Sequence, residues 1–313
     1  MLKNSSTKDP TRMDANESAF FTRQLEFIKS ATYDTKYKML KAISLIPVST
    51  EAPSGADSIT YRSFSKVGFA KIISDYANDF PRADIYGEEK TAKVRSIGSS
   101  YGYSIKEIRR AQMAQLTLDQ RRAEAARRAS DEKVDTIAWN GDSETGLQGL
   151  INYPGITEYT VPADGTGASK LWSTKTPDQI VRDITGLVNA IVSTTNGREA
   201  PDTLIMPIAN YMHIANTRMP YGTDKTILTF VLENSPFLKM VDWVVELNTA
   251  GLNSTAKMMA YTRNPMNLTL EIPQPFEQFP PQQKGMEFEI PCHQETGGVI
   301  VYYPLSVAYG DGI

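Results

Sequence analysis

The sequence contains one cysteine, Cys292, and two histidines, His213 and His293, in 313 residues. A single cysteine forms no internal disulfide, and the polar residues 1–14 lack the apolar core of a signal peptide. We therefore expect a cytoplasmic protein. No segment approaches the about 18 consecutive apolar residues of a membrane-spanning helix, which excludes the integral membrane class.

An excess of positive charge is also missing. Lys and Arg together number 33 against 36 for Asp and Glu, and the net charge of −3 excludes the strongly basic footprint of a dedicated nucleic-acid-binding protein. The hydrophobic content of 41% and the aromatic content of 9% are typical of a globular chain. The length predicts two domains, or one domain with large insertions.

So few histidines and cysteines leave little material for a metal site or a thiol nucleophile. Cys292 and His293 are neighbours in a segment that is typical of a strand, and neighbours on a strand point to opposite faces. We expect a buried cysteine and a histidine at the surface or satisfied by internal hydrogen bonds. We predict no catalytic residue, no metal and no cofactor.

Residues 98–102, Gly-Ser-Ser-Tyr-Gly, formally match the nucleophile elbow of serine hydrolases, with Ser100 as the nucleophile. That elbow joins a fully buried parallel strand directly to a helix. Here residues 90–97 are half polar, and the next helix signal begins only at Ser104. A serine hydrolase is kept as the enzymatic alternative. No phosphate-binding loop and no dinucleotide fingerprint is present.

The N-terminal third predicts an arm at residues 1–14, an amphipathic helix at 15–31 that 37–45 could extend, and then a long hairpin. Its strands are expected at residues 58–74 and 90–99, joined by an irregular tip. A long two-stranded ribbon is only marginally stable alone. We therefore expect this hairpin to lie on a neighbouring subunit, with an ordinary solvated hairpin as the alternative.

Charge is distributed unevenly along the expected hairpin. Acidic residues, Glu89 among them, crowd the tip. The shank carries basic residues, which are Arg62, Lys66, Lys71, Lys90, Lys93 and Arg95. We predict that the tip contacts basic groups of a neighbouring subunit, with Phe80 and Tyr86 as apolar anchors. The expected intersubunit residues are Asp75, Asp79, Phe80, Arg82, Asp84, Tyr86 and Glu88.

Three capping boxes mark helix starts, at residues 104–107, 117–120 and 176–179. The second opens the longest helix, which should end at Asn140-Gly141, a good left-handed cap. Leu118 and a stripe of alanines would let this helix pack closely on a sheet or another helix. Its paired arginines project elsewhere and would meet an internal polyanion or form ion pairs with interleaved acids; they are Arg121, Arg122, Arg127 and Arg128.

The rest of the chain predicts a mixed helical and strand unit followed by strands. After a glycine-rich loop at residues 141–152, helices are expected at 176–196, 207–218 and 225–232, with a short buried strand at 203–206. Further strands are expected at 241–247, 256–262, 268–272, 285–290 and 299–303.

This order of parts resembles the major capsid proteins of tailed bacteriophages and the related encapsulins. Local likeness lies in residues 101–108, in 135–141 followed by 146–150, and in Trp172 with Thr176-Pro177, and the resemblance covers about residues 55–310. It implies an α+β fold with an N-terminal arm, an extended loop, a peripheral domain and an α/β axial domain. The implied domains are 1–57 arm and helix, 58–103 extended loop, 104–176 peripheral with a spine helix at 117–139, 177–262 axial, and 263–313 returning strands.

The resemblance implies a structural protein that assembles into pentamers and hexamers of an icosahedral head around double-stranded DNA. An encapsulin-like nanocompartment shell is the alternative. Some family members begin with a scaffolding segment of roughly a hundred residues. Because only a short arm precedes the first expected helix, we expect a separate scaffolding protein, together with a portal and a possible cementing protein. The expected location is the virion capsid, after assembly in the cytoplasm of the bacterial host without contact with a membrane.

Overall fold

The computed structural model describes residues 37–67, 84–114, 121–220 and 224–313. Helices and strands both occur, with runs of consecutive strands at the start and at the end of the described chain. The elements below belong to the unit Leu40–Ile313. The α-helices are α2 (Ala42–Leu45), α3 (Ile105–Ala114), α4 (Arg121–Asn140), α5 (Pro177–Thr194), α6 (Ile208–Asn216) and α7 (Ile227–Asn234). The 3₁₀ turns are η1 (Trp172–Thr174), η2 (Val245–Thr249), η3 (Leu252–Ser254) and η4 (Pro304–Ser306).

Within the described residues, the strands form four sheets. The first seven strands are β1 (Val48–Ser49), β2 (Ser58–Val67), β3 (Asp84–Lys93), β4 (Arg95–Ser104), β5 (Thr157–Tyr159), β6 (Thr203–Met206) and β7 (Met240–Trp243). The others are β8 (Lys257–Tyr261), β9 (Leu268–Glu271), β10 (Glu277–Gln278), β11 (Gln282–Lys284), β12 (Glu287–Thr296), β13 (Gly298–Val301) and β14 (Val307–Asp311).

The central sheet has the order β5-β14-β8-β6-β7, and its inner strands β8 and β6 are buried throughout. Alternate residues of a strand point to opposite sides, so a strand buried on both faces has apolar residues throughout. In β8, Met258 and Ala260 belong to one hydrophobic core, and Met259 and Tyr261 to the other. The short apolar run of this strand therefore serves two cores at once.

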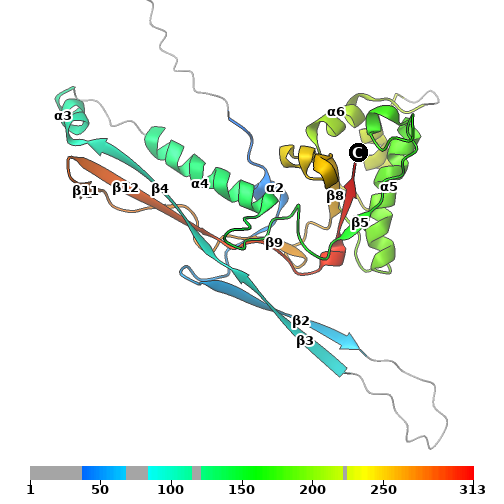
Figure 1. Cartoon of the computed structure of the whole chain (residues 1–313), viewed down its shortest axis with the longest axis horizontal. Coiled ribbons are helices and arrows are strands. Elements are labelled where there is room, and N and C mark those ends of the chain that lie inside the picture. Colours follow the sequence, from blue (N-terminus) through cyan, green and yellow to red (C-terminus); the bar gives the residue numbers. More distant parts are fainter. Residues whose placement is uncertain (1–36, 68–83, 115–120, 221–223) are drawn as a thin grey trace, which may run out of the picture. The chain divides into compact units, whose positions relative to one another are not determined.

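Helices cover one face of the central sheet (Figure 1). Ile180, Ile184 and Leu187 of α5 recur at helical spacing and are fully buried there, with residues of α6 and α7 beside them. The capping box predicted at the start of α5 is confirmed, because Thr176 and Gln179 each accept the backbone N–H of the other. The predicted helices at 207–218 and 225–232 are confirmed as α6 and α7.

The second core lies on the other face of the central sheet and joins it to α2, to the end of α4 and to the small sheet β1-β9-β13. Val134, Ala138 and Trp139 of α4 are fully buried in it. The predicted left-handed cap is confirmed at Gly141, whose φ is 72°. Of the predicted alanine stripe, Ala126 is buried but Ala125 and Ala129 are exposed, so the first half of α4 packs less closely than expected.

The predicted hairpin pairs differently from expectation. β2 pairs with β3 along its whole length, whereas β4 pairs with β12 in a sheet that also contains β10 and β11. The expected single strand at residues 90–99 is wrong, because it breaks at Val94, which is buried and donates its N–H to Asp57 O. The strand expected at 285–290 is longer and becomes β12.

Other local signals have mixed outcomes. The strand expected at 241–247 ends at Trp243 and continues as the 3₁₀ turn η2, and the helix expected at 37–45 is present only as α2. The arm at 1–14, the helix at 15–31 and the capping box at 117–120 lie outside the described residues. In the described part of the chain, no helix is long and apolar enough to cross a membrane.

Candidate assembly surfaces

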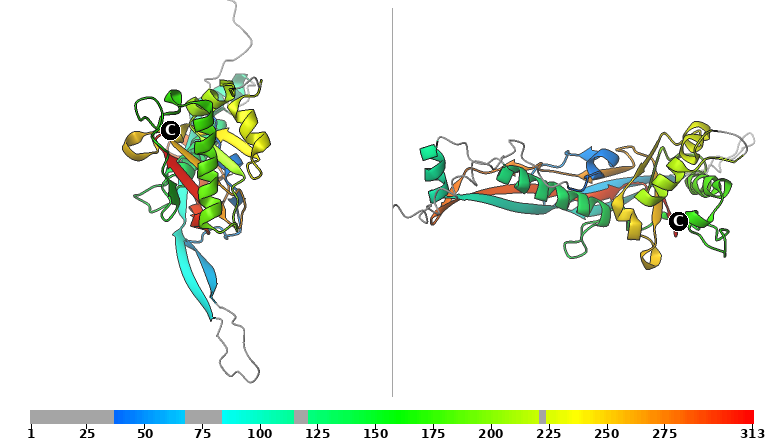
Figure 2. Two further views of the ribbon diagram at one scale, coloured as in Figure 1. Left: turned by 90° about the vertical axis from the view of Figure 1, so that its right-hand side faces the viewer. Right: turned by 90° about the horizontal axis from the view of Figure 1, so that it is seen from above.

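The β2–β3 hairpin presents both faces to solvent over much of its described length. In the described part of the chain these two strands pair with no other strand (Figures 1 and 2). In β3, every residue except Ala92 is exposed. Ile85 and Tyr86 are 66% and 64% exposed, which is unusual for large apolar side chains placed next to each other.

The hairpin root is held against the body by aromatic contacts. Tyr61 of β2 meets Tyr302 edge to face, with ring centroids 5.1 Å apart. Burial, followed by a hydrogen bond with Tyr153, raises the pKa of the Tyr61 phenol. The root is therefore packed, and the exposed part begins beyond it.

The charge pattern of the hairpin is more mixed than the sequence indicates. Asp84, Tyr86 and Glu88 lie within strand β3 rather than in an irregular tip. Glu89 pairs with Arg62 directly across the ribbon, at 2.6 Å between Nε and Oε1. Lys90 lies 3.6 Å from Glu88, so two basic shank residues are already engaged within the hairpin. The other predicted contact residues, Asp75, Asp79, Phe80 and Arg82, lie outside the described residues.

Arg122 and Arg127 of α4 pair with acidic side chains. Arg122 Nη2 lies 2.9 Å from Glu107 Oε1, its Nη1 donates to Gly102 O, and its guanidinium stacks over the Tyr103 ring. Arg127 pairs with Asp131 one turn later, at 3.8 Å. Arg121 is exposed and Arg128 is half-buried.

Glu107 also completes the predicted capping box of α3, which is confirmed: its Oε2 accepts from Ser104 N, and its own N–H donates to Ser104 Oγ. The hydrogen bond from Arg122 and that from Ser104 together lower the pKa of Glu107 to about 2. Because this pKa is below its ordinary value of 4.5, Glu107 stabilises the fold above pH 4.5 and loses its effect as the pH falls towards 2.

We expect Glu107→Gln to unfold at lower urea concentration than the native chain at pH 7, and the difference to vanish between pH 4.5 and pH 2. Urea midpoints at pH 7, 4 and 2.5 check this. The control is Glu144→Gln in an exposed loop, which should leave the midpoint unchanged at every pH. A difference that persists undiminished at pH 2.5 would contradict the assignment.

The far end of the β4–β12 sheet carries exposed apolar side chains that the sequence pattern does not predict. Met113 of α3 and Met286 before β12 are 88% and 75% exposed. No residue of 105–113 is buried, although Ile105 and Ile108 lie one turn apart on α3. The signal was present as an amphipathic helix, but a sequence pattern does not tell whether its apolar face has a partner within the chain.

The hydrolase geometry is absent. Ser100 lies in the middle of β4, opposite Pro291 of β12 in an antiparallel pair, so no strand-to-helix elbow forms. Cys292 is buried, as predicted, and this burial raises the pKa of its thiol. The side chain of the adjacent His293 points to the other face of the strand and contacts Glu277. Ser100 therefore has no nucleophile geometry.

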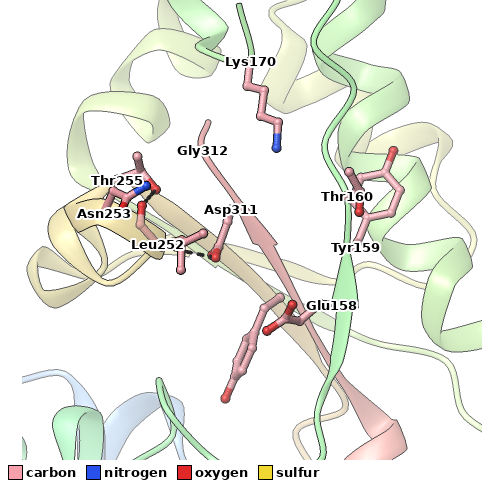
Figure 3. A pocket seen from close by; sticks show the side chains of 10 residues that line it. Glu158, Tyr159, Thr160, Lys170, Leu252, Asn253, Thr255, Asp311 and Gly312 are labelled. Carbon is pink, nitrogen blue, oxygen red and sulfur yellow. Dashed lines mark hydrogen bonds between the residues drawn. The ribbon is translucent and has the colours of Figure 1, made fainter.

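A cavity of about 310 Å³ lies between β5, η3 and the end of β14 (Figure 3). Glu158, Lys170 and Asp311 are the charged residues that line it. Asp311 is already engaged, because one carboxylate oxygen accepts from Leu252 N and the other lies 3.6 Å from Lys257 Nζ. Among the described residues, no three His, Cys, Asp or Glu side chains gather where they could hold a metal ion.

Comparisons with known proteins agree with this picture. A family model described as "Major capsid protein" matches residues 68–313. Among solved structures, the capsid of Myoviridae phage XM1 gives a TM-score of 0.77 at 20% identity, over 93% of this chain and 98% of that chain. An empty GTA particle capsid gives 0.65 at 9% identity, over 96% and 99%.

A third structure, a virus-like particle from Pyrococcus furiosus, gives a TM-score of 0.54 at 13% identity, over 85% of this chain and 90% of that chain. No curated protein matches the sequence. At these identities, the solved structures show a shared fold. The fold of this chain is therefore that of phage capsid proteins.

Proposed function

The chain belongs to the major capsid protein family, and from this premise we propose that it is the shell subunit of a tailed bacteriophage. The subunits join through heterologous contacts into pentamers and hexamers, which close into an icosahedral head around double-stranded DNA. The observation that carries the proposal is the β2–β3 hairpin, a ribbon with both faces exposed and large apolar side chains at its surface.

The same proposal includes the division of the chain into an extended loop, peripheral and axial domains. Residues 58–103 form the loop, 104–176 the peripheral domain and 177–262 the axial domain, with 1–57 as arm and 263–313 as returning strands. The break at Val94 puts the β4 part of the loop range into a different sheet from the hairpin. A separate scaffolding protein, a portal and a cementing protein are the proposed partners, and assembly takes place in the host cytoplasm.

We propose that the α4 arginines Arg121, Arg122, Arg127 and Arg128 contact packaged DNA non-specifically or form ion pairs with acidic neighbours. The pairing of Arg122 with Glu107 and of Arg127 with Asp131 supports an ion-pair role for those two. The slight net negative charge of the chain is compatible with a lining that does not hold each DNA turn tightly. A nanocompartment shell is not favoured, because the likeness to the virus-like particle is weaker than that to the phage capsid.

Sedimentation of the purified chain, with and without its scaffolding protein, followed by negative-stain electron microscopy, tests the proposal. Closed polyhedral particles or rings of five and six subunits are the expected result. The contents released from particles of infected cells distinguish the two kinds of cargo. Digestion of these contents by nuclease indicates a genome, and resistance indicates a protein cargo. A chain that sediments as a monomer under all assembly conditions would overturn the proposal.

We expect Tyr86→Ser to raise the subunit concentration needed for assembly about tenfold or more, because an exposed aromatic anchor at an interface contributes about 2 kcal/mol. The stability of the isolated subunit should not change, since Tyr86 lies on the exposed ribbon. Light scattering against concentration measures the first quantity and urea unfolding the second.

Tyr86→Phe is the matched control and should assemble like the native chain. Asp84→Lys with Glu88→Lys tests the charges in the same assay, with Asp84→Asn and Glu88→Gln as the neutral counterpart. We expect the lysine pair to weaken assembly more than the neutral pair. Unchanged assembly of both Tyr86→Ser and the lysine pair would remove this part of the hairpin from the interface.

A further inference from the structure

His293 lies where three segments of the chain meet. It belongs to β12 and stands opposite Gly98 of β4, on the sheet face away from the buried Cys292. Its Nδ1 is 3.3 Å from Glu277 Oε1 on β10, and its Nε2 is 3.8 Å from Glu295 Oε1 on β12. The imidazole ring thus lies between two carboxylates.

Each of these carboxylates holds a further part of the chain. Glu295 Oε2 accepts from Gly55 N at 3.0 Å, in the turn that leads into β2. Glu277 Oε2 accepts from the side-chain amide of Gln274 at 3.1 Å, and Glu295 N donates to Gln274 O. A change in the charge of the imidazole ring therefore alters the contacts of both carboxylates, and through them the hold on residues 274–278 and on the turn at the hairpin root.

The ring can serve both carboxylates only when it is protonated. Neutral imidazole has one N–H donor, so one carboxylate then faces a nitrogen lone pair. The imidazolium form presents an N–H to each carboxylate, at hydrogen-bond distance for Glu277 and at ion-pair distance for Glu295, and its charge offsets the repulsion between the two acids. Histidine is the side chain whose charge ordinarily changes between pH 5 and 8.

Other neighbours of the ring do not compete for this role. From β10 the charged group is Glu277, and from β12 itself it is Glu295. Opposite it, β4 presents Ser96, Gly98 and Ser100 on this face, none of which titrates in this range. The Phe279 ring lies 6.3 Å from the imidazole, centroid to centroid, and carries no charge.

We propose that His293 is a proton-controlled latch that fixes the turn before the β2–β3 hairpin and residues 274–278 to strand β12. The latch is closed when the ring is protonated and loosens when it is neutral. Its effect on hairpin direction during assembly rests on the proposed shell function, whereas the latch itself is a property of the single subunit.

Amide hydrogen exchange of the full-length, unassembled chain at pH 5.5 and 8.0, corrected for the intrinsic exchange rates, tests the latch. We expect peptides containing Gly55 and residues 274–278 to open about fivefold more often at pH 8.0, the size of effect of a partly exposed ion pair. The amides of the central sheet should open equally often at the two pH values. The ratio of opening at pH 8.0 to opening at pH 5.5 is called the pH ratio below. Equal opening of the peptides containing Gly55 and residues 274–278 at the two pH values would overturn the proposal.

Three variants make the test specific. His293→Gln should remove the pH ratio, and His293→Lys, which stays charged, should keep the latch closed at both pH values. His213→Gln on α6 is the matched control and should retain the native ratio. A ratio that persists in His293→Gln would overturn the latch, whereas failure of the chain to form particles would affect only the proposed shell function.

Discussion

We expect the Gly149→Ala variant to lose about 3 kcal/mol or more of its free energy of unfolding, because the added methyl group has no space. At this glycine the chain crosses the last turn of α4. A Cβ atom there would meet Gly141 N and would lie 2.5 Å from Trp139 O. Both obstacles are backbone atoms, which cannot rotate away as a flexible side chain can.

The crossing also completes the end of the helix. Leu150 N donates to Ala138 O at 2.8 Å, and Ile151 N donates to Trp139 O at 2.9 Å, which satisfies carbonyls that the helix itself leaves open. Leu150 and Ile151 are fully buried directly after it. A methyl group at residue 149 pushes this segment away and weakens both hydrogen bonds and the packing.

Urea unfolding followed by circular dichroism measures the loss. Gly98→Ala is the matched control, because a Cβ atom there meets nothing within 4 Å, and its effect should stay within about 0.5 kcal/mol. If Gly149→Ala is as stable as Gly98→Ala, the tight crossing over α4 is wrong.

The second large effect is expected at Lys175, whose side chain is completely buried. Its Nζ lies 2.5 Å from Asp183 Oδ2 on α5 and donates to Pro162 O at 2.7 Å. We expect Lys175→Met to lose about 3–5 kcal/mol, because the buried Asp183 carboxylate then lacks its closest partner. Chemical unfolding should register the loss.

The double variant Lys175→Met with Asp183→Leu separates charge from packing. Replacing both members of a buried pair by apolar groups avoids the isolated charge, so the double variant should be more stable than Lys175→Met alone. Lys284→Met breaks an exposed pair with Glu289 and should have a much smaller effect. A double variant that is less stable than the single one would contradict the isolated-charge explanation.

Local signals predicted much of the fold because their causes lie within a few residues. The boxes at Ser104 and Thr176 and the glycine cap at Gly141 each depend on atoms of adjacent turns. The apolar run at residues 203–206 predicted a short buried strand, which is confirmed as β6. The resemblance to capsid proteins rested on the order of such elements, and the family model matches residues 68–313.

Pairing between distant segments could not be predicted in the same way. Residues 90–99 have a continuous strand pattern, and nothing in it indicates that Val94 turns inward or that β12 is the partner of β4. Lys175 and Asp183 have the composition of a surface pair, and only the fold shows that both side chains are buried. The candidate contact surface was predicted at the hairpin, but Met113 and Met286 were not, since their exposure depends on tertiary structure.

The pairing of β4 with β12 has a consequence for the order of folding. β4 begins at residue 95 and its partner β12 at residue 287. The ten residue pairs between them are therefore contacts of very large sequence separation, which form late in folding. On the ribosome, where N-terminal parts emerge first, this sheet cannot close until almost the whole chain has been synthesised. Truncated chains that end before residue 287 therefore lack one strand of the sheet, and completion of translation sets the earliest moment at which this sheet can form.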